Sequence, residues 1–580
     1  MNEHNDNFPD PKKIEKELGE FLNKKFGGSV KIITPSVAVQ EAPVSGSGTA
    51  AQKKRILDFD LKPAELIAYL DQYIIRQEKA KSILATKICT HFNRIKHLAG
   101  NKDSDNRITG TIKSNILMLG PTGVGKTYLV KLIAKKIGVP FVKGDATKFS
   151  ETGYVGGDIE DLIRDLVKEA DDDIELAEYG IVYIDEIDKI AAANNLRGAD
   201  ISRTGVQRAL LKPMEETEID LKVPHDPVSM MQELERYQRT GKRTRRAVNT
   251  ANILFIVSGA FSELTEIIYN RVAKQSIGFG SSLTTSKKDP QLLKQTRAED
   301  LVEFGFESEF IGRLPVRCVL EPLSRDDLFS ILRMPNNPVV LGKRLDFSAY
   351  GIRILFSEEA LTILADRAFK ENTGARGLVS VIEDALIPFE EKLPSTLVST
   401  FTVTREVLES PQTALDELMT GQKAEKWDLL YQETSESEKR YITDYIMDNW
   451  KNLSIRHGLT LSKCRCALVA EYFCTHVTEL GNAIKSIKTY YETVKQIEVD
   501  FLNKHDLNIV LEEDAVDFLI EQFTKHQITA DDVIAKLHDK FYNGLNLVRE
   551  RTGKNRFFIS RSALLDHERF LADLIRKELS

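Results

Sequence analysis

Residues 115–127 read NILMLGPTGVGKT, in which a short apolar run leads directly into the pattern GxxxxGKT. In such a loop, glycines allow backbone N–H groups to turn toward phosphates, and the lysine reaches the β and γ oxygens. The helix-like stretch YLVKLIAKKIG follows the loop. This order of strand, loop and helix predicts a nucleoside triphosphate site whose residues are Pro121, Thr122, Gly123, Val124, Gly125, Lys126, Thr127 and Tyr128.

A second apolar run, IVYIDEID at Ile181–Asp188, contains two adjacent carboxylates. A strand that stops here delivers Asp185 and Glu186 to the carboxyl edge of an α/β sheet, where ligands bind. We expect Asp185 and the Thr127 hydroxyl to hold Mg²⁺, and Glu186 to polarise the attacking water. The two strings together predict a chain that binds and hydrolyses a nucleoside triphosphate.

The composition of the 580 residues is that of a globular protein with several domains, because 42% are apolar and 29% are charged. No apolar run is long enough to predict a membrane span, and the polar start MNEHNDNFPDPKK does not resemble a signal peptide. Five irregularly spaced cysteines favour a reducing compartment, so a cytoplasmic location is expected. The net charge of −7 argues against broad nucleic-acid binding.

Changes in amino-acid composition and in the pattern of apolar residues predict five segments along the chain. Residues 1–27 include an amphipathic helix, and the stretch at 28–56 is rich enough in Gly, Ser, Ala and Pro to predict a flexible linker. Strand-like and helical patterns alternate over 57–325, which predicts a mostly parallel sheet flanked by helices with right-handed crossovers. Residues 326–408 are expected to form a smaller α-rich lid, and residues 409–580 a mainly helical extension.

The secondary structure that positions the motifs follows from the apolar pattern. Five apolar runs are expected to form the strands of the sheet: 115–119, 140–144, 181–185, 252–258 and 315–320, with one further strand-like run at 352–356 in the lid. Apolar residues at helical spacing predict a helix after Gly157, and those on its apolar face are Ile159, Leu162, Ile163, Leu166 and Val167.

Two stretches of the chain that lie 155 positions apart resemble each other, which allows an internal repeat. The run IRILFSEEALTILADRAF at 352–369 resembles LNIVLEEDAVDFLIEQF at 507–523, and each places an apolar strand before an acidic helix start. A true duplication explains this likeness, and so do two unrelated strand–helix units of similar composition.

Four further strings point to one family. They are LDQYIIRQEKAK at 70–81, GYVG at 153–156, EFIGRLP at 309–315 and TGARGL at 373–378. Together with the two nucleotide motifs they are similar to the ClpX/HslU branch of AAA+ unfoldases, over about residues 60–405. The resemblance implies an AAA+ fold, ATP as the nucleotide, and a homohexameric ring that hydrolyses ATP at its subunit interfaces. It also implies that unfolded or tagged protein substrates pass through the central pore.

The resemblance assigns roles to five residues outside the phosphate loop. Ile74 and Ile75 match the apolar residues that sandwich the adenine, and Ser258 falls where a polar sensor would monitor the γ-phosphate. Arg313 matches the finger that reaches a neighbouring subunit's nucleotide, and Arg376 matches the sensor of the lid. Guanidinium groups suit developing phosphoryl charge. A surface ion pair is the alternative interpretation of Arg313.

The string GYVG predicts a loop that grips polypeptide. Tyr154 and Val155 supply an aromatic and an aliphatic side chain, and Gly153 and Gly156 on either side allow the loop to move. A tyrosine buried in the core is the alternative, but a core position would not need glycine on both sides. The resemblance therefore identifies residues 153–156 as a substrate pore loop.

A second loop predicts a partner protein. Ile277, Gly278 and Phe279 lie in the polar stretch QSIGFGSSLTTSKKD and resemble the ClpX loop whose tip enters apolar pockets on the ClpP peptidase ring. HslU lacks this loop. Exposed Ile and Phe side chains are costly unless a partner covers them. A loop anchored by folding these side chains inward is the alternative.

The sequence also departs from the family. It lacks the four-cysteine zinc module that opens a typical ClpX, and Arg76 replaces the glycine usual near the adenine pocket. The basic run at 239–246 lies where ClpX has its pore-entrance loop, and a solvated surface loop explains it equally well. Cysteines 464, 466 and 474 with a nearby histidine allow a metal site, but buried free cysteines are the more common outcome.

The leading interpretation is an ATP-driven unfoldase that supplies substrates to a ClpP-type peptidase. No Ser-His-Asp or HExxH peptidase signature is present, so cleavage would occur in another chain. A chaperone that remodels complexes without a peptidase is one alternative. A nucleic-acid motor is another, and the negative net charge and the GYVG string argue against it.

Overall fold

The computed structural model describes residues 59–100, 113–149, 159–191, 201–221, 247–276, 286, 289–421, 423–526 and 528–579. The N-terminal helix and linker expected within 1–56, the pore loop at 153–156, the basic run at 239–246 and the docking loop at 277–279 lie outside these residues. The chain divides into two compact units. The first comprises Met1–Pro63, Lys79–Pro121 and Lys126–Leu320, and the second comprises Ala64–Glu78, Thr122–Gly125 and Glu321–Ser580.

A five-stranded sheet forms the centre of the first unit. Its strands are β1 (Ile116–Leu119), β2 (Phe141–Asp145), β3 (Ile181–Asp185), β6 (Leu254–Gly259) and β7 (Val316–Val319). They lie in the order β2-β3-β6-β1-β7, and every neighbouring pair is parallel. All four residues of β1 are buried, as expected for a strand that is covered on both faces. The predicted parallel α/β sheet is confirmed.

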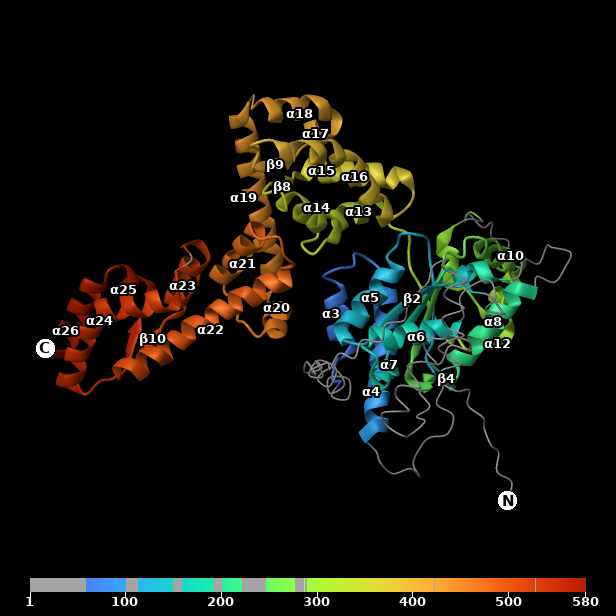
Figure 1. Cartoon of the computed structure of the whole chain (residues 1–580), viewed down its shortest axis with the longest axis horizontal. Coiled ribbons are helices and arrows are strands. Elements are labelled where there is room, and N and C mark those ends of the chain that lie inside the picture. The colour runs from blue at the N-terminus through green and yellow to red at the C-terminus, as the bar shows by residue number, and fades with distance from the viewer. Residues whose placement is uncertain are drawn as a thin grey trace, which may run out of the picture. The chain divides into compact units, whose positions relative to one another are not determined.

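Helices cover the sheet of the first unit (Figure 1). The helix after residue 157 is confirmed as α6 (Ile159–Glu169), and its five predicted apolar residues are buried. The other helices are α4 (Glu78–Gly100), α5 (Lys126–Ile137), α7 (Ile174–Ala177), α8 (Ile201–Met214), α10 (Leu264–Ser276), α11 (Ala298–Phe304) and α12 (Ser308–Gly312), with short 3-10 turns η2 (Ala146–Lys148), η3 (Ile187–Ile190), η4 (Thr250–Asn252) and η5 (Pro290–Gln295). A two-stranded antiparallel pair, β4 (Glu218–Asp220) with β5 (Ala247–Asn249), completes the unit.

Strand limits differ from the prediction by one or two residues, with physical causes. The run expected to begin at residue 252 starts at Leu254, because the Asn249 side chain caps the 3-10 turn η4 through the backbone N–H of Ala251. The runs expected to begin at Pro140 and Pro315 start one residue later. Proline has no N–H to contribute to a ladder of hydrogen bonds.

The second unit is mostly helical and begins with α3 (Pro63–Leu70) and the segment that follows it. Its lid contains α13 (Arg325–Arg333), α14 (Pro338–Ser348), β8 (Arg353–Phe356), α15 (Glu358–Glu371), α16 (Ala375–Lys392), η6 (Leu393–Ser395), β9 (Thr400–Val403), α17 (Arg405–Glu409) and α18 (Pro411–Thr420). The single strand-like run expected in the lid was therefore an incomplete prediction. Strand β9 pairs with β8 in parallel, and its four residues form a strand only because that partner is present.

The extension continues with α19 (Ala424–Asp448), α20 (Trp450–His457), α21 (Lys463–Thr475), α22 (Leu480–His505), β10 (Ile509–Leu511), α23 (Glu513–His526), α24 (Ala530–Thr552), β11 (Phe557–Ile559), α25 (Arg561–Leu565) and α26 (His567–Leu579). Two apolar cores stabilise the second unit. The lid core runs from Leu328 to Trp427, and the extension core runs from Ile442 to Ala563. The lid core thus includes Trp427 at the start of α19, beyond residue 408, and the domain limits given above stay predictions.

The extension repeats the fold of the lid. The order β8, α15, α16, β9, α17, α18 recurs as β10, α23, α24, β11, α25, α26, and both strand pairs are parallel. Helices α15 and α23 begin and end 155 positions apart, and so do the first residues of α16 and α24. Unrelated strand–helix units would not share six elements and their strand pairing. The structure therefore supports a duplication.

Candidate functional site

The phosphate loop connects β1 to α5, and its glycines adopt backbone angles that other residues avoid. Gly123 and Gly125 have φ of 77° and 92°. The ammonium group of Lys126, at the start of α5, donates hydrogen bonds to the carbonyl oxygens of Gly120 at 2.5 Å and Pro121 at 2.9 Å. The first turn of α5 contains no acidic residue. Its N-terminus can therefore accept an anion such as a phosphate.

Strands β3 and β6 and the start of helix α5 bring a cluster of oxygen atoms to the carboxyl edge of the sheet. The Thr127 hydroxyl lies 3.3 Å from Asp185 Oδ2 and 3.1 Å from the hydroxyl of Tyr183. The Ser258 hydroxyl donates to Asp185 Oδ1 at 2.7 Å and lies 2.6 Å from the Tyr183 oxygen. Carboxylate and hydroxyl oxygens are the hard ligands that Mg²⁺ prefers. Thr127 and Asp185 thus fit the predicted metal position.

Asp185 is held in its charged form. Burial raises the pKa of this carboxyl, but the hydrogen bond from Ser258 and the ion pair with Lys143 outweigh burial and leave the pKa below its usual range. Lys143 Nζ lies 3.0 Å from Asp185 Oδ2. The prediction missed Lys143, although it stands on β2, the edge strand beside β3, where a basic residue could reach the carboxylate.

Glu186, the first residue after β3, ends the extended backbone of the strand. Its φ of 58° lies in the left-handed region, which costs roughly 1–2 kcal/mol for a residue that carries a side chain. Its backbone N–H donates to Asp185 Oδ1 at 3.1 Å, and its side chain is exposed. Two adjacent carboxylates therefore have different surroundings, one partly buried in the oxygen cluster and one open to solvent. This separation suits two different roles.

Arg313 makes the ion pair that its alternative interpretation described. Its guanidinium lies 2.5 Å from Glu215, and about half of its side chain, 48%, is exposed. Its backbone carbonyl accepts a hydrogen bond from Asn115 Nδ2 at 3.2 Å, which fixes the end of α12 beside β1. An exposed arginine on a fixed backbone remains able to change partners. Its contact with a neighbouring subunit stays a prediction.

The segment proposed to hold the adenine lies in the second unit, directly after α3. Ile74 is buried and Ile75 is partly buried. Arg76, which replaces a glycine of the family, has a φ of 61° and so keeps the backbone conformation that glycine favours. Ion pairs with Asp327 at 2.8 Å and Glu321 at 3.1 Å hold it in place. Position 76 is therefore a left-handed residue although it carries a side chain.

The start of α16, which contains the predicted sensor Arg376, lies next to residues of the phosphate loop within the second unit. The N–H of Ala375 donates to the carbonyl oxygen of Gly123 at 2.8 Å, and a Cβ on Gly123 would overlap the carbonyl oxygen of Thr373. Arg376 is exposed on the first turn of α16, a turn that has no acidic residue and no side-chain cap. A cation and an open helix N-terminus at this place favour an anionic ligand.

The equivalent helix of the extension begins differently. Thr529 caps α24 in a capping box with Asp532, and Asp531 occupies the position that corresponds to Arg376. The side chains of Thr529 and Asp532 accept hydrogen bonds from backbone N–H groups at the start of α24. The negative charges of Asp531 and Asp532 would also repel a phosphate. The second copy of the lid fold therefore has an acidic residue at the position where the first copy has Arg376.

The cysteines of α21 do not converge. Cys464 is exposed, Cys466 is buried and Cys474 is partly buried, so the first two point away from each other. In the part of the chain that the structure describes, no three His, Cys, Asp or Glu side chains are close enough to hold a metal ion. Nor does any helix in the described ranges have the length and apolarity needed to cross a bilayer.

A parallel sheet in this order, with a phosphate loop after β1 and an acidic pair after β3, defines an AAA+ ATPase. Residues 112–317 match the family model of the AAA domain (Cdc48 subfamily), and residues 323–389 match that of the C-terminal, D2-small domain of ClpB protein. Nucleotide binding and ATPase activity follow from this class.

Two curated relatives identify the family within this class. The ATP-dependent Clp protease ATP-binding subunit ClpX of Treponema denticola is 38% identical over 337 residues, which are 57% of this chain and 77% of the relative. The protein of the same name from Borrelia duttonii is 40% identical over 342 residues, or 58% and 75% of the two chains. The chain belongs to the ClpX family, which confirms the resemblance of its motifs.

Proposed function

We propose that this chain is an ATP-dependent protein unfoldase and translocase that assembles as a homohexamer and supplies substrates to a ClpP-type peptidase. The observation that carries the proposal is the oxygen cluster at the sheet edge, in which Thr127 and Asp185 approach to 3.3 Å beside the exposed side chain of Glu186. This arrangement suits hydrolysis of a triphosphate. The name shared by the two relatives, ATP-binding subunit of a Clp protease, supports the rest of the proposal.

Each residue of the site has a proposed part in ATP hydrolysis. Pro121, Thr122, Val124 and Tyr128 would complete the loop around the phosphates, while Lys126 binds the β and γ oxygens. A Mg²⁺ ion held by Thr127 and Asp185 would neutralise charge between these phosphates. Ser258 would orient Asp185 and Glu186 would polarise water, with Arg376 from the lid and Arg313 from a neighbouring subunit stabilising the transferred phosphoryl group.

The proposed work on protein substrates depends on the pore loop Gly153–Gly156. Burying one apolar side chain contributes only ~1.5–3 kcal/mol, whereas a folded domain resists with ~5–15 kcal/mol. A single loop therefore cannot unfold a stable domain at equilibrium. Several loops in a ring, with repeated strokes that capture transient local openings, can do so. This comparison of magnitudes favours a hexamer over a monomer.

The proposed peptidase partner rests on the loop that contains Ile277, Gly278 and Phe279. Both relatives are named as subunits of the ATP-dependent Clp protease, which supports a ClpP-type partner for this chain. All five cysteines are free, which agrees with the proposed reducing cytoplasm. Remodelling without a peptidase is the competing function. The two functions differ in one measurable result: a remodeller would unfold substrates without their degradation by ClpP.

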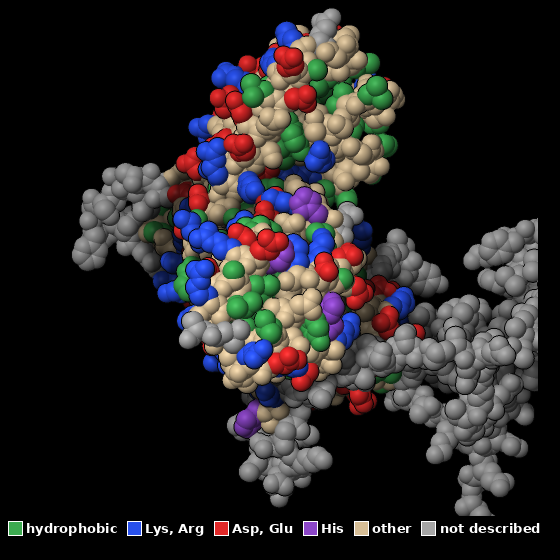
Figure 2. All heavy atoms as spheres, turned by 90° about the vertical axis from the view of Figure 1, so that its left-hand side faces the viewer, with side chains coloured by type: hydrophobic (Ala, Val, Ile, Leu, Met, Phe, Trp, Pro, Cys, Tyr) green, Lys and Arg blue, Asp and Glu red, His purple; other side chains and the backbone are tan. Residues whose placement is uncertain are grey.

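A nucleic-acid motor receives no support from the visible surface. Figure 2 shows one face on which Lys and Arg side chains are interspersed with Asp and Glu side chains over the described residues. Nucleic-acid binding typically requires a patch or stripe of one sign. The mixed charge of this face agrees with the net charge of −7.

One assay series tests the proposal, namely ATP turnover, unfolding of a stable tagged fluorescent protein, and its degradation with added ClpP. We expect Tyr154→Ala to keep ATP turnover and to lose unfolding at least tenfold, since the pore loop would lose its largest apolar contact. Deletion of Phe279 should keep turnover and unfolding and lose degradation. Tyr350→Ala is the matched control, because this tyrosine is 68% exposed on the lid.

Two results would contradict these assignments. Normal unfolding by Tyr154→Ala would remove the pore loop from the mechanism, and equal degradation by the Phe279 deletion would remove the docking loop. Unfolding without any stimulation of ClpP, in the unaltered chain, would establish the peptidase-independent remodeller instead.

A further inference from the structure

The extension contacts the segment that leads into the proposed adenine pocket. Arg456 of α20 donates a hydrogen bond to Gln72 Oε1 at 2.8 Å, and its guanidinium lies 4.5 Å from the ring of Tyr69. The Tyr73 hydroxyl donates to Glu479 Oε2 at 3.3 Å. All of these residues belong to the second unit. Three of the five residues before Ile74, namely Tyr69, Gln72 and Tyr73, are therefore held by residues from the C-terminal half of the chain.

These contacts are partly shielded from solvent, which favours them over contacts between fully exposed side chains. Tyr69 is only 7% exposed, and burial lowers the pKa of Arg456, with the nearby tyrosines opposing that effect. Burial also raises the pKa of the Tyr73 hydroxyl, so it stays a proton donor to Glu479. A guanidinium on an aromatic face interacts more strongly when it is desolvated.

The extension is itself joined firmly to the lid. The N–H of Leu480, the first residue of α22, donates to Asn336 Oδ1 at 2.9 Å in a buried position. Arg344 of α14 pairs with Glu438 of α19 at 2.5 Å. Because both bonds connect the extension with the lid helices, α20 and the start of α22 have a fixed base from which to hold the adenine segment.

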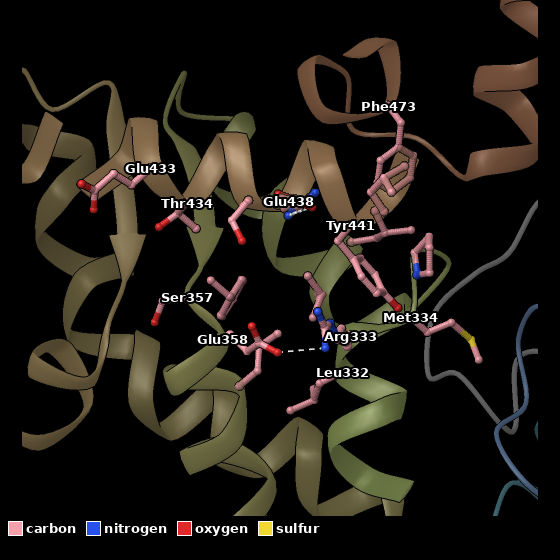
Figure 3. Close-up of a pocket in the computed structure, with 18 residues that line it drawn as sticks. Leu332, Arg333, Met334, Ser357, Glu358, Glu433, Thr434, Glu438, Tyr441 and Phe473 are labelled. Atoms are coloured by element: carbon pink, nitrogen blue, oxygen red, sulfur yellow. Dashed lines mark hydrogen bonds and ion pairs between the residues drawn. The ribbon is translucent and has the colours of Figure 1, made fainter. Parts of the chain in front are cut away.

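A cavity of about 260 Å³ marks the same junction of lid and extension (Figure 3). Arg333 of the lid points into it, forms an ion pair with Glu358 at 2.8 Å, and lies 4.3 Å from the ring of Tyr441 on α19. Arg333 therefore links the lid to the extension, because it pairs with Glu358 within the lid and lies over the ring of Tyr441 in the extension.

The opposite end of the adenine segment is held by the lid. Arg76 pairs with Asp327 and Glu321, and the Gln77 side chain exchanges two hydrogen bonds of 2.8 Å with the backbone of Glu321. Ile74 and Ile75 thus lie between an anchor on the extension and an anchor on the lid. A short segment fixed at both ends keeps its side chains in one place.

We propose that Arg456 and Glu479 are positioning residues for the adenine pocket, so that the extension sets the affinity of this chain for ATP. The proposal rests on the proposed function, because it takes Ile74 and Ile75 as the residues that contact the base. Coupling between two sites is reciprocal. Bound nucleotide therefore stabilises the attachment of α20 and α22 to the adenine segment by the same factor.

The test compares ATP turnover by the full-length chain and its variants. We expect Arg456→Ala to raise the KM for ATP about fivefold or more, the lower end of typical coupling, with kcat changed less than about twofold. Its preference for ATP over GTP should fall as well, because only the base contacts are disturbed. Arg456→Lys should restore part of the affinity, since a cation over Tyr69 remains.

Arg440→Ala is the matched control, because this arginine of α19 is 77% exposed and its ion pair with Glu436 lies along its own helix. A folded Arg456→Ala variant whose KM and ATP preference stay within twofold of the unaltered chain would overturn the proposal. Equal loss of kcat and no rescue by lysine would also overturn it, by showing a merely structural role.

A second measurement separates this proposal from the adenine assignment. Hydrogen exchange over residues 64–78 without nucleotide should be faster in Arg456→Ala and Glu479→Ala, whatever the segment binds. Ile75→Ala tests the base contact directly through KM. Faster exchange together with a normal KM in Ile75→Ala would refute the adenine assignment, whereas unchanged exchange would refute the anchoring role of Arg456 and Glu479.

Discussion

At the scale of single residues, Asp185 is the most constrained group of the site. It accepts hydrogen bonds from Ser258 and from the N–H of Glu186, and it pairs with Lys143. Each of these contacts favours the carboxylate over the neutral acid. The lowered pKa of Asp185 therefore depends on identifiable neighbours, and it can be changed without changing Asp185 itself.

Replacing Ser258 by alanine should raise the pKa of Asp185, because the hydroxyl hydrogen bond stabilises only the charged form. A hydrogen bond to a charged group contributes ~1.5–3 kcal/mol, which corresponds to about one to two pH units. Activity that requires the carboxylate should then be lost at a higher pH as the solution is acidified. The measurement is the acid limb of kcat/KM for ATP, which reports the free enzyme.

Ser348→Ala provides a control, because Ser348 is an exposed serine at the end of α14. Its pH profile should match that of the unaltered chain. Superimposable acid limbs for Ser258→Ala and the control would show that Asp185 does not govern this part of the profile.

At the scale of elements, the most informative comparison lies within the chain. Helices α16 and α24 begin at equivalent places in the two lid-like folds, yet one begins with an uncapped glycine and an arginine and the other with a capping box and two aspartates. The same backbone architecture thus offers an anion site in one copy and a closed helix end in the other.

We expect Arg376→Ala to reduce ATP turnover by about tenfold or more, because it removes the charge that we propose to face the phosphoryl group. The equivalent change in the second copy, Asp531→Ala, should leave turnover unchanged. It should weaken only α24, by ~0.3–1 kcal/mol through the lost helix-dipole interaction. Steady-state ATPase assays and thermal unfolding measure the two effects.

Reduced ATP turnover in Asp531→Ala would contradict this prediction, because it would show that the lid-like fold of the extension takes part in ATP hydrolysis. Normal turnover in Arg376→Ala would instead remove the sensor role from the lid. If Asp531→Ala melted at the same temperature as the unaltered chain, the acidic start of α24 would not make its predicted contribution to stability.

At the scale of the whole molecule, the proposed assembly places Arg313 of one subunit at the nucleotide of the next. Mixing two inactive variants tests this arrangement. Glu186→Gln subunits keep the arginine and lose the water-polarising carboxylate, and Arg313→Ala subunits do the reverse. In a randomly mixed ring, about one quarter of the interfaces would combine both intact groups, so about a quarter of normal ATP turnover should return.

Absence of recovery in rings that are shown to mix would place Arg313 and Glu186 in the same site, or leave Arg313 with its surface ion pair to Glu215 as its only role. Recovery without any hexamer, measured by mass photometry, would exclude the ring. Residual turnover in either variant alone sets the baseline.

Much of the nucleotide site could be predicted from the sequence, because its parts are contiguous strings. The phosphate loop, the strand before Asp185 and the start of α16 each place their residues through local backbone geometry. Contacts between distant parts of the chain could not be predicted in the same way. Arg456 meets Gln72 across 384 positions, and Lys143 meets Asp185 only because β2 and β3 are neighbours. Packing, rather than local pattern, determines such pairs.

The extension shows the same limit. Its first strand and helix resemble those of the lid in sequence, but α24, β11, α25 and α26 were recognisable as repeated elements only from the order and pairing of the strands. Short strands such as Phe557–Ile559 have too few residues to be recognised before their partner is known.

Arg76 and Gln77 form two consecutive left-handed residues, with φ of 61° and 67°. This left-handed conformation costs roughly 1–2 kcal/mol for each residue. The backbone would relax if the contacts that hold it were lost. The contacts that hold Arg76 are its ion pairs with Glu321 and Asp327 at the start of the lid. If α13 moved away from Arg76, the backbone at residues 76 and 77 would lose these contacts and the neighbouring Ile74 and Ile75 could shift. Under the proposed function, such a movement of the lid would loosen the hold on the nucleotide.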